Sequence, residues 1–161
     1  RTFHGVDFIY FVKALKNIYK NHNGLENVLL PRIMESNYKN SISNFKKIFF
    51  SLNHPYRTEK HVSDPQKNSA AKRIHMYLRW MVREQKAGVD FGIWKSHHAK
   101  NLSCPLDVHS GRVARKLGLL ERKQNDWKSV TQLDSELRKM DKNDPVKYDF
   151  ALFGLGVFEK F

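Results

Sequence analysis

The sequence predicts an all-α protein. Apolar residues recur at intervals of three and four along most of the chain, which is the period of an amphipathic helix. Short clusters rich in proline, glycine and asparagine interrupt these stretches, as expected between packed helices. Hydrophobic residues make up 40% of the 161 residues, which is too apolar for a disordered basic tail. We therefore expect residues 1–161 to form a single helical domain.

Three helices are predicted in the N-terminal third of the chain. The first covers Asp7 to Tyr19 and the second covers Leu25 to Ile33, where Pro31 disturbs the last turn. The third covers Ser41 to Leu52, and the prolines that follow predict a surface connection over residues 53–67. The apolar stripe assigned to the core in the first helix consists of Phe8, Phe11, Val12, Leu15, Ile18 and Tyr19.

A fourth helix is predicted from Ser69 to Arg83. The apolar residues Ile74, Tyr77, Leu78 and Met81 follow the spacing i, i+3, i+4, i+7, so this stripe should face the core. The residues that fall on the opposite side, where Met76 and Trp80 hint at a cleft, are Lys72, Met76, Arg79 and Arg83. A lysine on such a side is normally solvated, and the spacing alone gives Lys72 no other role.

Asp107 stands at the start of a short basic helix. It follows the apolar approach Cys104-Pro105-Leu106, and the basic residues Arg112, Arg115 and Lys116 lie three and four positions apart behind it. An aspartate that opens a helix is normally an N-cap, because its carboxylate accepts hydrogen bonds from backbone N–H groups. A catalytic carboxylate is the alternative, and the pattern leaves both interpretations open.

A C-terminal helix is predicted over about residues 144–159. It opens at Asp144-Pro145, which is a cap followed by proline at the first helical position. Asp149 is either an ordinary surface carboxylate or part of the lining of a base pocket. The apolar residues assigned to the core are Val146, Phe150, Phe153 and Val157.

The charge balance favours an anionic partner. The chain has 29 lysines and arginines against 16 acidic residues, a formal net charge of +13, so its surface field should concentrate DNA, RNA or an acidic membrane face. No apolar run approaches the roughly 18 residues of a membrane span, and no secretory segment is present, so we expect no membrane partner. The chain begins at Arg1, from which we expect that an N-terminal segment is missing.

The cysteine and histidine content argues against metal and disulfide chemistry. A lone Cys104 allows no disulfide framework, no four-thiolate zinc site and no iron–sulfur cluster, and it fits a reducing cytoplasmic location. His61, His97 and His98 lack the spacing of a zinc site, so we assign them as exposed loop residues and expect no metal.

Several segments of this chain resemble known families. The chain is identified as a member of a bacterial family called domain of unknown function 2400. The resemblance is clearest at His61-Val62-Ser63, Ser69-Ala70-Ala71-Lys72-Arg73, Tyr77-Leu78-Arg79-Trp80-Met81-Val82-Arg83, Val89-Asp90-Phe91-Gly92-Ile93-Trp94 and the run from Asp144 to Gly154. That family in turn resembles the helix-hairpin-helix DNA glycosylases, the superfamily of endonuclease III and 8-oxoguanine glycosylase, over the hairpin, the Asp segment and the final helix.

The second resemblance implies a catalytic pair within residues 61–120. In those glycosylases a Gly-x-Gly-x-Lys hairpin joins two helices and holds a DNA phosphate, and its lysine attacks the sugar. The matching segment here is Asn68-Ser69-Ala70-Ala71-Lys72, in which Asn68 and Ala70 replace both glycines, although asparagine can still adopt a left-handed conformation. Lys72 is thus the implied nucleophile, with Lys67 as the alternative. Asp107 would stabilise the developing positive charge and help to deprotonate the lysine.

The resemblance therefore implies a base-excision DNA glycosylase that acts on duplex, damaged DNA, with or without abasic-site lyase activity. It implies no cofactor, and we expect a monomer. The implied DNA contacts are Asn68, Ser69, Arg73, Arg79, His109, Arg112, Arg115 and Lys116. The missing glycines favour an alternative, a noncatalytic helix-hairpin-helix module that binds DNA or RNA. A third hypothesis is a protein-interaction domain whose charge serves only solubility.

Overall fold

Helices and short 3₁₀ turns form the regular secondary structure of this protein, whose computed structural model describes residues 2–84, 88–159 and 161. The described residues contain no strand, only two isolated bridges, so the all-α prediction is confirmed. The α-helices are α1 (Gly5–Asn21), α2 (Gly24–Leu29), α3 (Lys39–Phe49), α4 (Lys72–Val82), α5 (Val108–Lys116), α6 (Trp127–Met140) and α7 (Asp149–Val157). The 3₁₀ turns are η1 (Tyr56–His61), η2 (Pro65–Lys67), η3 (Ala99–Asn101) and η4 (Pro145–Tyr148).

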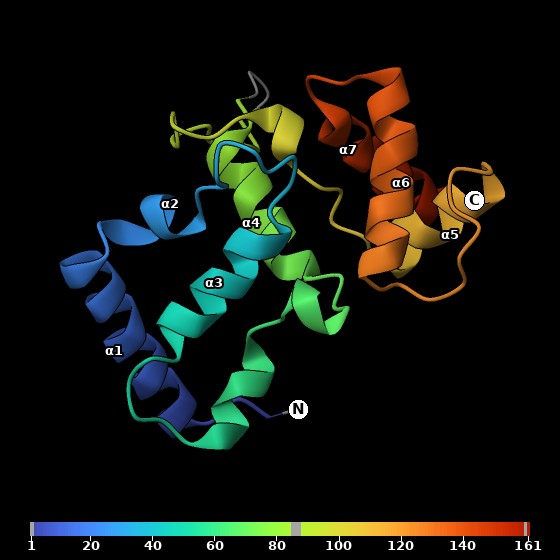
Figure 1. The fold of residues 1–161 in the computed structure, drawn as a ribbon. Coiled ribbons are helices and arrows are strands. Elements are labelled where there is room, and N and C mark those ends of the chain that lie inside the picture. Colours follow the sequence, from blue (N-terminus) through green and yellow to red (C-terminus); the bar gives the residue numbers. More distant parts are fainter. Residues whose placement is uncertain (1, 85–87, 160) are drawn as a thin grey trace.

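Helix α4 occupies the middle of the molecule. Figure 1 shows α1, α2 and α3 on one side of it and α5, α6 and α7 on the other. The predicted inner stripe of α4 is confirmed, because Leu78 is fully buried and Ile74, Tyr77 and Met81 are half-buried against the same cluster. None of the described helices is long and apolar enough to span a bilayer.

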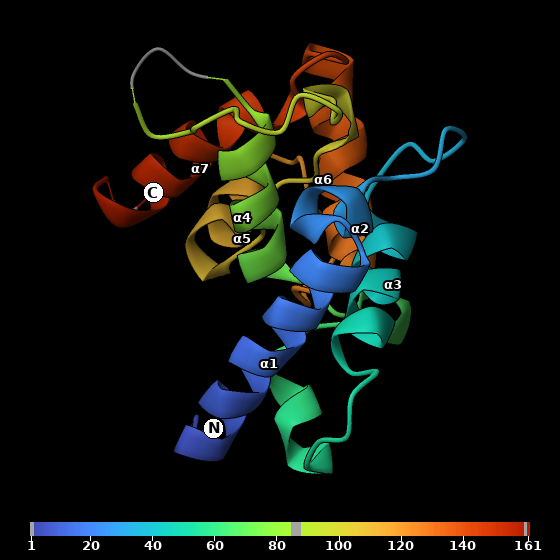
Figure 2. The same ribbon diagram turned by 90° about the vertical axis from the view of Figure 1, so that its left-hand side faces the viewer.

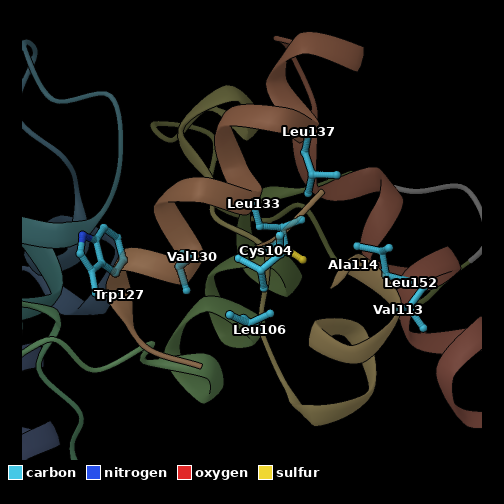
Figure 3. Packing of buried hydrophobic residues seen from close by; sticks show 10 residues of the cluster. Cys104, Leu106, Val113, Ala114, Trp127, Val130, Leu133, Leu137 and Leu152 are labelled. Atoms are coloured by element: carbon cyan, nitrogen blue, oxygen red, sulfur yellow. The ribbon is translucent and has the colours of Figure 1, made fainter. Parts of the chain in front are cut away.

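A separate cluster of apolar side chains fills the C-terminal half. Figure 3 shows Val130, Leu133 and Leu137 of α6 turned toward Cys104 and Leu106, with α5 and α7 beyond them. The three α6 residues are fully buried. Helix α6 was not predicted above, although its buried positions follow helical spacing from Trp127 to Leu137. This cluster packs α6 against the segment before α5, against α5 and against α7.

The structure shifts the boundaries and one face of the predicted N-terminal helices. Helix α2 ends at Leu29 rather than Ile33, because a proline at position 31 cannot continue the hydrogen-bonded ladder. The predicted stripe of the first helix is partly wrong: Ile18 is buried, but Phe8 and Val12 are exposed. Helix α1 instead packs through a face that includes Tyr10, whose hydroxyl donates to the carbonyl of Phe49.

Helices α5 and α7 approach each other closely at Gly156. A Cβ atom at this position would lie 2.9 Å from the carbonyl oxygen of His109 and 3.0 Å from its Cβ. Glycine is therefore the residue that lets the two backbones pack together here. The contact fixes α7 against the N-terminal end of α5, where Asp107 caps the helix.

Candidate active site

A cavity of about 300 Å³ opens between α4, the segment before α5, and α7. Figure 2 shows α4, α5 and α7 in the left half of the molecule. Apolar and charged side chains both line the cavity, which is common in small-molecule sites. The lining residues are Lys72, Arg73, Met76, Arg79, Pro105, Asp107, Asp149, Phe150 and Phe153. Four residues proposed from sequence, Lys72, Arg73, Arg79 and Asp107, thus meet at one cavity.

Lys72 reaches this cavity from the first turn of α4. The helix begins there because Ala71 adopts a left-handed conformation, with φ 44° and ψ 35°. A non-glycine residue in this region is strained, by about 1 kcal/mol, and such residues cluster at functional sites. The turn replaces the expected first helical residues from Ser69 and leaves the Lys72 side chain exposed.

Asp107 caps α5 and lines the cavity at the same time. Its Oδ1 accepts hydrogen bonds from the backbone N–H groups of His109 and Ser110, both at 2.8 Å, and from the Ser110 hydroxyl at 3.1 Å. Among the described residues, none donates a hydrogen bond to Oδ2. The two interpretations of Asp107 are therefore compatible, because one oxygen holds the helix and the other is left for a ligand.

Asp149 and Arg79 form a buried ion pair at the back of the cavity. Asp149 is 6% exposed and Arg79 5% exposed. Burial raises the pKa of the Asp149 carboxyl, and the neighbouring Arg79 charge opposes that shift. Asp149 is therefore a pocket residue and not a surface carboxylate. The expectation that Arg79 lies on an outer face is wrong, because α7 and residues 88–94 cover that face. Its contact with DNA stays a prediction.

Asp90 is the second partner of Arg79. Its Oδ1 accepts from Arg79 Nε at 3.1 Å, while its Oδ2 accepts from Arg83 Nη1 at 2.9 Å. Arg83 in turn donates to Asp144 at 2.8 Å, so the pairs form a continuous chain from Asp149 to Asp144. The Arg79 guanidinium also lies 4.4 Å from the centre of the exposed Phe150 ring. Phe150 and Phe153 line the cavity, which corrects their assignment to the core.

The predicted hairpin forms a tight connection between η2 and α4. Asn68 is left-handed as expected, with φ 61°, and its carbonyl accepts from the backbone N–H of Trp127. Its side-chain amide donates to Asp126, and the Ser69 hydroxyl accepts from the N–H of Ala71. The element before the turn is a 3₁₀ turn of three residues. Asn68 and Ser69 therefore hold the turn together through contacts within the protein.

The basic residues of α5 contact other parts of the chain. Arg112 donates to the carbonyls of Gly156 and Phe161, and Arg115 donates to the carbonyl of Arg122 and the side chain of Asn125. Lys116 lies over the Phe161 ring, and His109 packs edge-on against Phe153. None of these four residues lines the cavity. They remain predicted DNA contacts that lie at its edge or beyond it.

The remaining sequence candidates lie elsewhere. Lys67, the alternative nucleophile, is exposed at the end of η2 and does not line the cavity. The assignment of His97 to an exposed loop is wrong: it is buried between the Tyr38 hydroxyl at 2.8 Å and the Glu26 carbonyl at 2.9 Å. His61 is half-buried, 3.5 Å from Asp7, and His98 is exposed. The described residues contain no cluster suited to a metal ion.

Asp90, the buried partner of Arg79, was not predicted from the sequence, whereas Asp149 was named above as a possible part of a base pocket. Val89, Phe91 and Ile93 alternate with Asp90 and Gly92 in the sequence, which predicts that the three apolar side chains point inward, but the structure exposes them and buries Asp90, Gly92 and Trp94. This period of two is typical of an extended segment with one buried face. Here the buried face is the one that carries Asp90, because Arg79 and Arg83 give its carboxylate cationic partners in the interior.

Comparisons with known proteins add one finding at the level of the family. A family described as "Protein of unknown function (DUF2400)" matches residues 1–158. No curated protein and no solved structure matches the chain.

Proposed function

The chain belongs to the DUF2400 family, and we propose that this member is a DNA glycosylase of the helix-hairpin-helix type that excises bases from damaged duplex DNA. Lys72 is the nucleophile of the proposal and Asp107 its catalytic carboxylate. One observation carries the proposal. Lys72 and Asp107 are 35 positions apart and were paired by the resemblance, and both line a single cavity of about 300 Å³. The net charge of +13 supports a nucleic-acid partner.

The cavity has features that a flipped nucleotide requires. A glycosylase takes its target base out of the stack and holds it between apolar or aromatic side chains. Phe150, Phe153 and Met76 provide such walls, and Arg73 lies at the cavity on the exposed first turn of α4, where it would meet a phosphate. In the proposal, the apolar walls hold the base and Arg73 binds the backbone.

The proposed reaction joins Lys72 to the sugar. The lone pair of the neutral Lys72 Nζ attacks C1′ of the sugar while the glycosidic C–N bond breaks. The electron pair of that bond leaves with the base, which takes up a proton. Oδ2 of Asp107 stabilises the positive charge that develops on the sugar and accepts a proton from the lysine. Opening of the sugar ring then gives an iminium ion between Lys72 and C1′. Elimination from this ion is the lyase step.

The substitution Asp107→Asn tests the carboxylate. Asparagine is about as good an N-cap as aspartate, so the melting temperature and DNA affinity should change little. It carries no charge, so we expect the single-turnover rate of base excision to fall by at least about 100-fold. Wild-type excision by the Asn variant would show that Asp107 is only a cap.

Reduction with borohydride tests the nucleophile. On abasic-site DNA the wild-type protein should form a covalent adduct that peptide mapping places at Lys72, and Lys72→Ala should remove it. Lys67→Ala is the matched control and should trap fully, because Lys67 lies outside the cavity. The reverse pattern would assign the nucleophile to Lys67.

A noncatalytic DNA-binding module is the second candidate. Its support is the hairpin, in which Asn68 and Ala70 replace both glycines and the Asn68 side chain binds Asp126. This candidate predicts duplex binding that Arg73→Ala weakens for all sequences alike, with no excision from a broad panel of lesions and no adduct on abasic DNA.

A further inference from the structure

The connection between α2 and α3 contains a turn with two apolar side chains at its tip. The backbone N–H of Glu35 donates to the carbonyl of Arg32 at 2.8 Å, and the Glu35 carboxylate accepts from the Arg32 N–H at 3.2 Å. Ile33 and Met34 are the two central residues between these bonds, and both are essentially fully exposed. Figure 2 shows the turn projecting to the right of the molecule. The turn therefore holds two large apolar side chains in water by a defined hydrogen-bond pattern.

A groove of about 620 Å³ lies beside this turn. Its walls come from the turn, from the segment around η3 and from the C-terminal end of α6. Cations outnumber carboxylates in the lining by four to one. These charged residues are Arg32, Lys100, Arg138, Lys142 and Glu35.

Three of the four cations are available to a ligand. Arg138 is held within the protein, because it donates to the Leu102 carbonyl at 2.9 Å and lies 3.5 Å from Asp134. None of the ion pairs among the described residues includes Arg32, Lys100 or Lys142, so these three side chains have no carboxylate partner there. All three side chains are exposed, so the groove presents uncompensated positive charge.

We propose that this groove and turn form a second nucleic-acid contact, which binds duplex DNA. Arg32, Lys100 and Lys142 bind backbone phosphates, and Ile33 and Met34 insert at a base step. Exposed isoleucine and methionine beside an arginine are the residues that proteins use as wedges in the minor groove. The cations line a concave groove beneath the tip, which fits a curved polyanion better than the flat surface of a membrane.

This contact is separate from the candidate active site. Figure 2 shows the turn on the side of the molecule opposite α5 and α7. The two sets of lining residues share no member. The base pairs that bind at this groove cannot at the same time place a base in the cavity beside Asp107. The proposal for the groove therefore stands or falls independently of catalysis.

Two double variants of the full chain test the proposal with a labelled duplex that contains no lesion or abasic site. Lys100→Gln with Lys142→Gln should lower affinity by about 10- to 50-fold at about 0.1 M salt and reduce the slope of log K against log salt by about 2. Ile33→Ser with Met34→Ser should lower affinity about tenfold and leave the slope unchanged, because no phosphate contact is lost. The matched control is Lys13→Gln with Lys16→Gln on α1, which removes the same charge from exposed positions and should change affinity less than about twofold.

Affinities of both groove variants equal to that of the α1 control would overturn the proposal. Binding of the wild-type chain to phosphatidylserine vesicles, lost in the Ile33 and Met34 variant while duplex affinity stays intact, would also overturn it in favour of a membrane. Excision by the candidate active site is measured separately, so its absence would leave the affinity result interpretable.

Discussion

His75 is enclosed on α4 with neither ring nitrogen bonded to a described residue. It stacks on Trp127, with 5.7 Å between the ring centres. Burial lowers the pKa of His75 from 6.5 to about 4, because the charged ring would lose its hydration without gaining a partner. The free energy of unfolding therefore depends on pH through His75.

The sign of that linkage follows from the direction of the shift. The folded pKa lies below the unfolded one, so the contribution of His75 to stability is complete above about pH 6.5 and is lost as the pH falls toward 4. Between pH 7 and pH 5 the wild-type free energy of unfolding should fall by roughly 2 kcal/mol more than that of His75→Leu. Urea titrations of both proteins at each pH measure this difference.

Asp134 acts in the opposite direction over part of the same range. Burial raises the pKa of its carboxyl to about 6, with the Arg138 charge opposing, so protonation between pH 6 and 4 favours the folded state. Because both proteins in the comparison contain Asp134, its effect cancels in the difference. Parallel pH profiles for wild type and His75→Leu would contradict the assignment to His75.

At the scale of elements, the α5–α7 contact depends on one glycine. In Gly156→Ala the new Cβ would meet the backbone of His109 at about 3 Å, where no flexible side chain can move away. We expect the helices to separate and the free energy of unfolding to fall by about 1–3 kcal/mol, even though alanine favours a helix.

Gly154→Ala is the matched control in the same helix. The nearest atom to a Cβ there is in the Phe158 ring, at 4.0 Å, so alanine fits. This variant should be more stable than wild type by about 0.5–1 kcal/mol. Thermal unfolding of the three proteins measures both shifts, and a Gly156→Ala protein as stable as Gly154→Ala would refute the close approach.

At the scale of the whole molecule, ion pairs connect parts of the chain that are distant in sequence. Asp90 joins Arg79 of α4 to Arg83, the residue that follows this helix. Through these two arginines it reaches Asp149 of α7 and Asp144, the residue before η4. Its side chain is fully buried. Loss of this charge would leave two arginines with too few partners in the interior.

The substitution Asp90→Asn measures the value of that network. Removing one partner from buried ion pairs is destabilising, and here we expect a loss of about 3 kcal/mol in the free energy of unfolding. Glu84→Gln makes the same chemical change in the exposed pair with Lys95 and should change stability by less than about 0.5 kcal/mol. Denaturant unfolding of both variants gives the comparison, and equal effects would show that the buried network adds nothing.

Local signals in the sequence predicted most of the helices and some of their ends. Apolar spacing located α3 and the inner stripe of α4, Pro31 marked a break after α2, and an N-cap was one of the two interpretations given to Asp107. These features depend on residues within a few positions of one another, so spacing and propensity suffice to predict them. Helix α6 carried the same kind of signal and was overlooked.

Tertiary structure alone decided which faces are covered and which residues meet. Arg79 looked like a surface cation because its cover, Asp90 and Asp149, comes from segments 11 and 70 residues away. Phe150 and Phe153 looked like core residues, yet they line a cavity because α7 is held by Gly156 at one side and Arg79 at the other. The pairing of Lys72 with Asp107 came from resemblance, and their common cavity exists only because α4, α5 and α7 pack together. Long-range packing sets these contacts, and no local period in the sequence encodes it.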